Sequence, residues 1–168
     1  MTVQHLLPKV QIEAQTRALW YHQQIIYATR TRGGTMIKGV VFDFDGLILD
    51  TELPVFRAWQ EIFAAHGQEL SLADWSDYIG RSPDSFDPCD DLERTLGRKL
   101  DRDRIHAEHQ RREAKLIESE GVMPGVVDLI GQARKRNLHL GIASSSEQAW
   151  VVRHLERLGL AGAFETIR

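Results

Sequence analysis

The sequence predicts an α/β fold, in which a parallel sheet carries a block of helices inserted after its first strand. Three observations predict it. A short β-branched and aromatic run, Val40–Phe42, lies between glycines as a buried strand does. Residues 53–119 then carry the start and stop signals of successive helices, and after Gly121 the signals of helices alternate with those of strands. A helix between consecutive strands indicates parallel pairing, so the core is expected to be a parallel sheet.

Each element is predicted from its own local signals, chiefly caps, a first-turn proline and closing glycines. The first expected element is the strand Val40–Phe42. Four helices should follow: one that Pro54 opens and Gly67 closes, one from the cap Ser71 through Tyr78, one capped by Asp90 or Asp91 and ending near Gly97, and one from the cap Asp101 to about Ser119. The last expected elements are a helix opened by Pro124-Gly125 and running through Arg136, the strand Leu138–Ala143, the helix Glu147–Leu158 and the start of a third strand over Phe164–Ile167.

Residues 1–35 form a separate N-terminal extension in this prediction. They carry four basic side chains and one acidic one, and the segment is followed by a second methionine, Met36. An upstream extension or misplaced start is the first interpretation; an ordered helix over Ile12–Tyr27 and a targeting segment are the alternatives.

Composition excludes several classes of protein. The apolar share is 42% and the charged share 27%, as in globular proteins, and no run approaches the roughly 20 apolar residues that span a membrane. With a net charge of −3, the chain offers no broad basic surface for nucleic acid. The single cysteine, Cys89, cannot form an internal disulfide, which predicts a reducing compartment such as the cytoplasm. A pair of histidines, His106 and His109, is interpreted as part of a solvated helix face because no third metal ligand is evident in the sequence.

The central chemical feature is a pair of aspartates, Asp43 and Asp45, where the first strand ends. Two carboxylates two residues apart at the carboxyl end of a parallel strand repel each other unless a cation or substrate compensates. Mg²⁺ would do so, since it prefers oxygen ligands and bridges to phosphate. Asp43 is the expected nucleophile, Asp45 the expected general acid and base, and both are expected metal ligands.

The longer run Asp43-Phe44-Asp45-Gly46-Leu47-Ile48-Leu49-Asp50-Thr51-Glu52 resembles the first motif of the haloacid dehalogenase-like superfamily. It is most similar to the branch of β-phosphoglucomutase and small sugar-phosphate phosphatases, and the resemblance extends over about 36–168. It implies a partial doubly wound, Rossmann-like parallel sheet with an inserted α-helical cap. The implied core comprises 36–50 and 121–168, and the implied cap domain comprises 51–120.

The resemblance also implies which residues bind the substrate. Ser144 matches the hydroxyl that binds a phosphoryl oxygen in this family, although the serines there can equally cap the following helix. The run Gly80-Arg81-Ser82 resembles the loop of the cap that recognises the part of the substrate that is not transferred. The full set of expected substrate-binding residues is Ser144, Ser145, Gly80, Arg81, Ser82 and Glu52.

The expected activity is therefore Mg²⁺-dependent hydrolysis of a small phosphorylated metabolite. Pro83, where mutase-like members would have arginine, favours a phosphatase over a mutase, and Asp45 argues against dehalogenation. A sugar phosphate mutase and a catalytically inactive fragment or binding module remain the alternatives. The family's later lysine and acidic motif have no match here, so we expect little turnover. We also expect self-association through an exposed edge of the first strand, unless residues 1–35 cover it.

Overall fold

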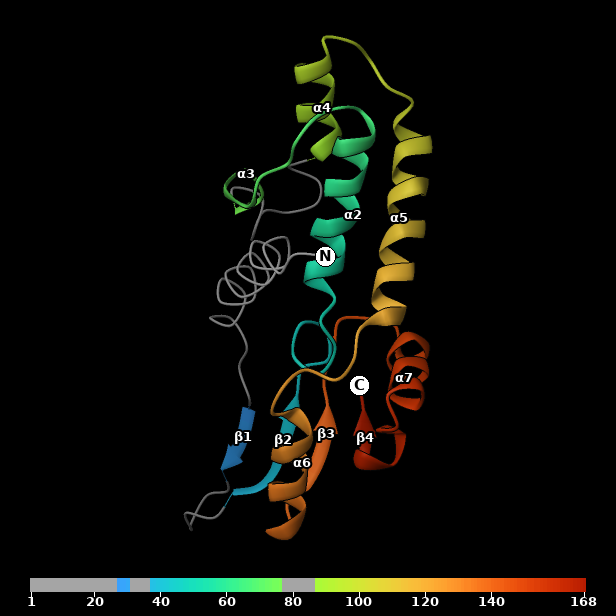
Figure 1. Ribbon diagram of the computed structural model, residues 1–168. Coiled ribbons are helices and arrows are strands. Elements are labelled where there is room, and N and C mark those ends of the chain that lie inside the picture. The colour runs from blue at the N-terminus through green and yellow to red at the C-terminus, as the bar shows by residue number, and fades with distance from the viewer. Residues whose placement is uncertain (1–26, 31–36, 77–86) are drawn as a thin grey trace, which may run out of the picture. The chain divides into compact units, whose positions relative to one another are not determined.

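The computed structural model of the 168-residue chain describes residues 27–30, 37–76 and 87–168. The chain divides into two compact units, Met1–Thr51 with Glu120–Arg168, and Glu52–Ser119. The first is an α/β unit and the second a helical unit (Figure 1). The predicted fold class, α/β with an inserted helical block, is confirmed. That the helical unit acts as a cap stays a prediction.

The α/β unit contains a four-stranded sheet in the order β1-β2-β3-β4, visible as adjacent arrows in Figure 1. Its strands are β1 (Tyr27–Arg30), β2 (Ile37–Phe42), β3 (His139–Ile142) and β4 (Thr166–Ile167). β2, β3 and β4 are parallel, as predicted, whereas β1 is antiparallel to β2. The helices of this unit are α6 (Val126–Lys135) and α7 (Gln148–Arg157), followed by the 3₁₀ turn η4 (Ala161–Ala163).

β1 was not predicted as a strand, and its pairing means that β2 is not an edge strand. Residues 27–30 pair with the edge of β2 that was expected to be exposed unless residues 1–35 cover it. The helix considered over Ile12–Tyr27 lies outside the described residues except for Tyr27, which begins β1. Self-association itself stays a prediction, now without a free β2 edge to support it.

The sheet packs through alternate residues of β2. Val40 and Phe42 are buried while Val41 between them is only partly so, the period of two expected of a strand. Phe42 contacts Phe164 edge to face with ring centroids 5.6 Å apart. β2 also begins three residues earlier than predicted, and it includes Gly39, where a side chain would meet the carbonyl oxygen of His139 at 3.0 Å. The glycine therefore allows the close approach of β3.

The helical unit contains α2 (Glu52–Ala65), α3 (Leu72–Ser76), α4 (Pro88–Leu96) and α5 (Arg102–Ser119). α2 and α5 lie side by side (Figure 1) and pack through aromatic rings. Trp59 of α2 stacks on His109 with centroids 4.5 Å apart, and His109 Nε2 lies 3.1 Å from the carbonyl oxygen of Val55. His109 is 8% exposed, so its assignment to a solvated face was wrong.

The caps of the helical unit were predicted in part. Ser71 and Asp101 cap α3 and α5 as expected, since their side chains accept the backbone amides of Asp74 and Arg104. α4 starts earlier than predicted. Asp87, in place of Asp90 or Asp91, is its N-cap and accepts the amide of Cys89 at 2.9 Å, and Pro88 occupies the first turn.

Candidate functional site

The parallel pairing of β2 with β3 brings together the two segments that carry the predicted catalytic residues. Phe42 pairs with Ile142 as the last residues of both strands, and the amide of Ala143 donates to the carbonyl oxygen of Phe42 at 2.9 Å. The carboxyl ends of parallel strands meet at one edge of the sheet. Asp43 is thus the first residue after the end of β2, and Ser144 is the second residue after the end of β3.

Asp45 is held by three side chains of the segment that follows β3. Its Oδ2 accepts hydrogen bonds from Ser146 Oγ at 2.6 Å and from Ser144 Oγ at 3.2 Å. Its Oδ1 lies 3.4 Å from Nε1 of Trp150, in the first turn of α7. Donors on both oxygens fix the carboxylate in position, and they reduce its need for another positive partner.

Asp43 differs from Asp45 in its surroundings. The side chain is exposed, and its Oδ1 accepts the amide hydrogen of Phe44 at 2.7 Å. Phe44 itself is fully buried, so the residue between the two aspartates anchors them to the core. One carboxylate is therefore accessible to a ligand and the other is held by neighbouring side chains. That difference suits a nucleophile and a positioned acid or base, respectively.

The loop after Asp45 turns sharply because Gly46 adopts a φ of 72°, a conformation that other residues rarely take. The turn is closed by bonds from the Gly46 amide to Leu49 at 2.8 Å and from the Ile48 amide to Phe44 at 2.9 Å. A further bond from Met123 to the carbonyl oxygen of Ile48, at 2.9 Å, ties the loop to the start of the second core segment. The turn leads the chain away from the end of β2, as predicted.

The side chains at this strand edge fit a hard divalent cation. The donors are carboxylate and hydroxyl oxygens from Asp43, Asp45 and the serines, with no sulfur or imidazole nitrogen among these contacts. Oxygen donors are the ligands that Mg²⁺ prefers. Asp43 is the better placed of the two aspartates, because its carboxylate is exposed whereas both oxygens of Asp45 already accept hydrogen bonds.

The other expected site residues have different outcomes. Ser145 is exposed between the two serines that contact Asp45. Glu52 is the first residue of α2 and belongs to the helical unit, so its role in substrate binding stays a prediction. The loop Gly80-Arg81-Ser82 lies outside the described residues.

Sequence reasoning missed two residues that contact Asp45, Ser146 and Trp150. The signal for Ser146 was present, since serines at i and i+2 of one turn can face the same group, and Ser144 Oγ also accepts the amide of Ser146 at 3.0 Å. No comparable signal pointed to Trp150, whose indole reaches Asp45 only because α7 starts close to the strand end.

A buried histidine, His154, lies one helical turn after Trp150 on α7. It is 0% exposed, and its ring meets that of Trp150 with centroids 4.1 Å apart. Arg157 Nε donates to its Nδ1 at 3.2 Å, so a neutral ring carries its proton on Nε2, which is buried without a hydrogen-bond partner among the described residues. Burial, reinforced by Arg157 and Arg153 and opposed by Asp45, lowers the pKa of His154. The imidazole is therefore held neutral.

The helical unit has a cavity of its own, of about 530 Å³, between α2 and α5. Its lining includes Arg98, Arg104, Arg111 and Arg112, and Arg112 is already paired with Glu61 and Glu108 at 2.9 Å and 2.7 Å. The predicted catalytic aspartates do not line it. This cavity is consequently distinct from the strand-end site.

Comparison with known proteins gives a family and several relatives. Residues 37–168 match the family described as haloacid dehalogenase-like hydrolase. The chain is 43% identical over 133 residues to the Bacillus subtilis protein named "Putative phosphatase YhcW", covering 79% of this chain and 60% of that protein. It is 27% identical over 146 residues to a phosphoglycolate phosphatase of Synechococcus elongatus, with coverage of 79% and 60%. The chain thus spans about 60% of the length of these relatives.

A solved structure from Thermotoga maritima, titled as that of a "putative beta-phosphoglucomutase", superposes with a TM-score of 0.61 at 20% identity. The match covers 76% of this chain and 58% of that one. At this identity the likeness concerns the fold, and it agrees with the α/β class and helical insertion described above.

Proposed function

The chain belongs to the haloacid dehalogenase-like hydrolase family, and from this premise we propose that it carries the nucleophile of a Mg²⁺-dependent phosphohydrolase acting on a small phosphorylated metabolite. The observation that supports this most directly is the contrast between an exposed Asp43 and an Asp45 held by Ser144 and Ser146. A hydrolase that proceeds through an aspartyl-phosphate requires both kinds of carboxylate at one site.

In the proposed reaction, an oxygen of Asp43 attacks phosphorus, and the bond to the leaving oxygen of the substrate breaks. Asp45 donates a proton to that leaving oxygen, then accepts one from the water that hydrolyses the aspartyl-phosphate. Mg²⁺, held by Asp43 and Asp45, would offset the negative charge of the phosphoryl group. Each carboxylate thereby returns to its starting state after one turnover.

Ser144 has two roles in this proposal. Its hydroxyl bonds Asp45 at 3.2 Å, the longer of the two serine contacts, whereas Ser146 bonds the same oxygen at 2.6 Å. The hydroxyl of Ser144 is the more readily released of the two, so it can turn to a phosphoryl oxygen while Ser146 keeps Asp45 in place. Ser145, Glu52 and Arg81 remain proposed substrate-binding residues on the strength of the motif alone.

The names of two relatives support phosphate ester hydrolysis over other chemistry, since both are called phosphatases. A sugar phosphate mutase stays the alternative. The likeness to a structure described as a putative phosphoglucomutase concerns the fold only, so it does not favour the mutase. Pro83, which favoured a phosphatase in the sequence, lies outside the described residues. The destination of the phosphoryl group, water or a second sugar hydroxyl, separates the two activities.

The test is hydrolysis of p-nitrophenyl phosphate by the 168-residue chain with and without Mg²⁺. We expect slow, Mg²⁺-dependent hydrolysis that Asp43→Asn abolishes, because an amide cannot attack phosphorus, and that Asp128→Asn leaves unchanged. Asp128 is the matched control, an exposed aspartate in the first turn of α6. Turnover retained in Asp43→Asn would remove the nucleophile assignment.

If turnover is undetectable, a second measurement shows whether the phosphoryl-transfer site is assembled. Beryllium fluoride forms an adduct on an aspartate that is poised to accept a phosphoryl group, and ¹⁹F NMR detects it. An adduct in the parent and in Asp128→Asn, but not in Asp43→Asn, supports the assembled site. No adduct and no turnover favour the alternative, a catalytically silent binding module.

The remaining expectations concern the protein's surroundings. No helix within the described ranges is both long and apolar enough to cross a membrane. Cys89 is a free, buried thiol, so a reducing compartment, the cytoplasm, stays our proposal for its location. Burial, with the nearby Asp87, raises the pKa of Cys89 to about 12, which argues against a catalytic thiolate.

A further inference from the structure

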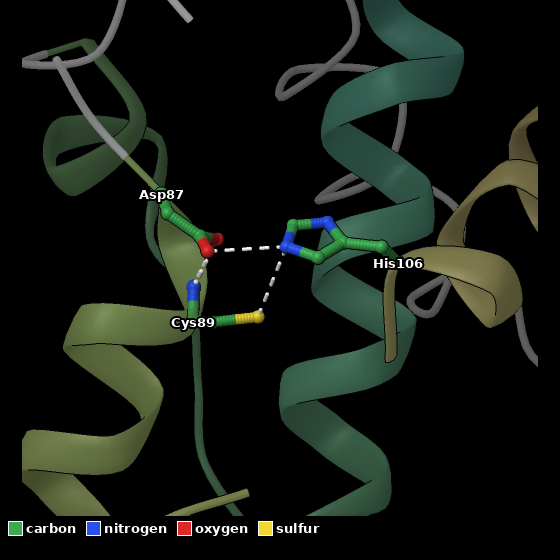
Figure 2. Close-up of side chains that lie close together, drawn as sticks. All are labelled: Asp87, Cys89 and His106. Atoms are coloured by element: carbon green, nitrogen blue, oxygen red, sulfur yellow. Dashed lines mark hydrogen bonds and ion pairs between the residues drawn. The ribbon is translucent and has the colours of Figure 1, made fainter. Parts of the chain in front are cut away.

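Three side chains of different chemistry converge in the helical unit, and none of them belongs to the proposed phosphohydrolase site. Asp87 and Cys89 belong to the N-terminal turn of α4, and His106 projects toward them from α5 (Figure 2). One ligand atom from each, a carboxylate oxygen, Sγ and an imidazole nitrogen, lies within 4.8 Å of the others. The rest of α4, a loop and the first turn of α5 separate Cys89 from His106 in the sequence, so only the tertiary fold brings them together.

The geometry around His106 is the informative part. Its Nε2 lies 3.1 Å from Asp87 Oδ2 and 3.8 Å from Cys89 Sγ, and Figure 2 shows one nitrogen facing both atoms. An imidazole Nε2 has either one N–H or one lone pair, so it cannot make a strong, linear hydrogen bond with both atoms. Nitrogen, oxygen and sulfur around one tetrahedral Zn²⁺ are separated by about 3.3 Å for N···O and about 3.6 Å for N···S, given the usual bond lengths. The observed separations are close to both values.

We propose that Asp87, Cys89 and His106 bind one Zn²⁺, with water as the fourth ligand. The site combines the three ligand types that zinc uses in proteins, and a soft thiolate with an imidazole discriminates against Mg²⁺. Binding exchanges the S–H bond of Cys89 for an S–Zn bond and releases the proton to solvent. The proposal is independent of the phosphoryl chemistry at the strand end.

Access and position suit a bound ion. Cys89 is completely buried, but the side chains of His106 and Asp87 are 43% and 25% exposed, so the cluster opens to water on their side. The thiolate would thus lie at the base of the site and water at its mouth. Asp87 is already fixed in orientation, since its Oδ1 accepts the amide of Cys89 at 2.9 Å.

The surrounding charges do not oppose a cation. Arg102 lies 3.3 Å from Asp87 Oδ2, but it also binds Asp90 at 2.6 Å and Glu93 at 2.6 Å, and Lys99 binds Glu93 at 2.8 Å. Three carboxylates therefore face two cationic side chains. With the thiolate added, the excess negative charge matches that of one divalent ion.

The bound ion would join α4 to α5, because Asp87 and Cys89 lie at the start of α4 and His106 lies on α5. In its absence the two helices are linked by the contact of His106 with Asp87 and by the ion pairs of Arg102 with Asp87, Asp90 and Glu93. Metal that binds the folded state and not the unfolded one raises stability. We therefore expect Zn²⁺ to raise the unfolding temperature of the helical unit.

The test uses Co²⁺ as a spectroscopic substitute for Zn²⁺ in the 168-residue chain, with excess Mg²⁺ present to occupy the aspartate site. We expect one equivalent of Co²⁺ to give a thiolate-to-cobalt charge-transfer band in the near ultraviolet, and one equivalent of Zn²⁺ to displace it. Cys89→Ser should lose the band, and His106→Gln should lose most of the binding. His66→Gln is the matched control, since His66 lies in the turn directly after α2 and bonds the carbonyl oxygen of Ile62.

Two results would overturn the proposal: no charge-transfer band in the parent chain, or equal Co²⁺ binding by the parent and His106→Gln. Circular dichroism of each variant checks the fold. Should Cys89→Ser fail to fold, His106→Gln still decides the question, because His106 is nearly half exposed and its ring makes only an edge contact with Trp59 in the core.

Discussion

The neutral, buried imidazole of His154 makes the stability of the α/β unit depend on pH. Burial, with the charges of Arg157 and Arg153, lowers its pKa in the folded chain. In the unfolded chain the group titrates near its ordinary value of about 6.5. Between the two pKa values the unfolded state binds more protons, so stability is fully present above about pH 6.5 and falls as the pH is lowered.

The size of the effect has an upper bound set by one proton. If His154 stays neutral in the folded state down to pH 5, protonation of the unfolded state alone lowers stability by about 2 kcal/mol relative to pH 7. The ring is 0% exposed and its Nε2 has no partner among the described residues, so burial disfavours the protonated form in the folded chain. Asp45 attracts the protonated form and reduces the effect.

The perturbation that isolates this group is His154→Leu, which keeps a similar volume and removes the titration. The variant also loses the ring contact with Trp150, about 1 kcal/mol, but equally at both pH values. Urea denaturation followed by far-ultraviolet circular dichroism gives the free energy of unfolding at pH 7 and pH 5. The parent should lose more stability than the variant, by up to about 2 kcal/mol.

Other titrating groups, such as His109, whose pKa burial also lowers, act in both proteins and cancel in the comparison. His139→Gln is the control, because this imidazole is 74% exposed and pairs with Glu165 on the surface. It should not flatten the pH dependence. A parent and His154→Leu that lose the same stability between pH 7 and pH 5 would refute the reasoning.

Two further predictions concern the strand-end site. Ser146→Ala removes the 2.6 Å bond to Asp45 and should lower both the free energy of unfolding, by about 1 kcal/mol, and any phosphatase turnover. Ser145→Ala should leave the free energy of unfolding nearly unchanged, so equal destabilisation by the two variants in urea denaturation would contradict the contact. Gly46→Ala forces a φ of 72° on a residue with a side chain and should destabilise the chain by about 1 to 2 kcal/mol in the same denaturation assay. Gly121→Ala is the control and should be nearly neutral, because a side chain at position 121 would lie in open space. A neutral Gly46→Ala would show that the turn relaxes.

Elements with strong local signals were predicted from the sequence. The glycine-bounded strand at Val40–Phe42 and the Pro124-Gly125 helix start lie in the structure near their predicted positions, because backbone restriction at these residues is local. The position of Asp43 and Asp45 followed from the end of that strand. Parallel pairing then placed Ser144 beside Asp45, as the strand order implied.

The features that were not predicted from the sequence depend on contacts between distant parts of the chain. Asp87 displaced Asp90 as a cap because the helix could start one turn earlier at a proline, a choice among several acidic residues that sequence could not rank. His109 is buried because Trp59 of another helix stacks on it, and Trp150 reaches Asp45 across the sheet edge. β1 carried no usual strand signal and is stabilised by the neighbouring strand.

The pairing of β1 with β2 has a consequence for the outer edge of β2. Residues 27–30 precede Met36, so a polypeptide initiated at that methionine would lack them and would leave the outer amides and carbonyls of β2 without backbone partners. Those groups are a template on which a second molecule can add a strand. Backbone pairing with residues 27–30 would then also protect the edge of β2 from adding a strand of a second molecule.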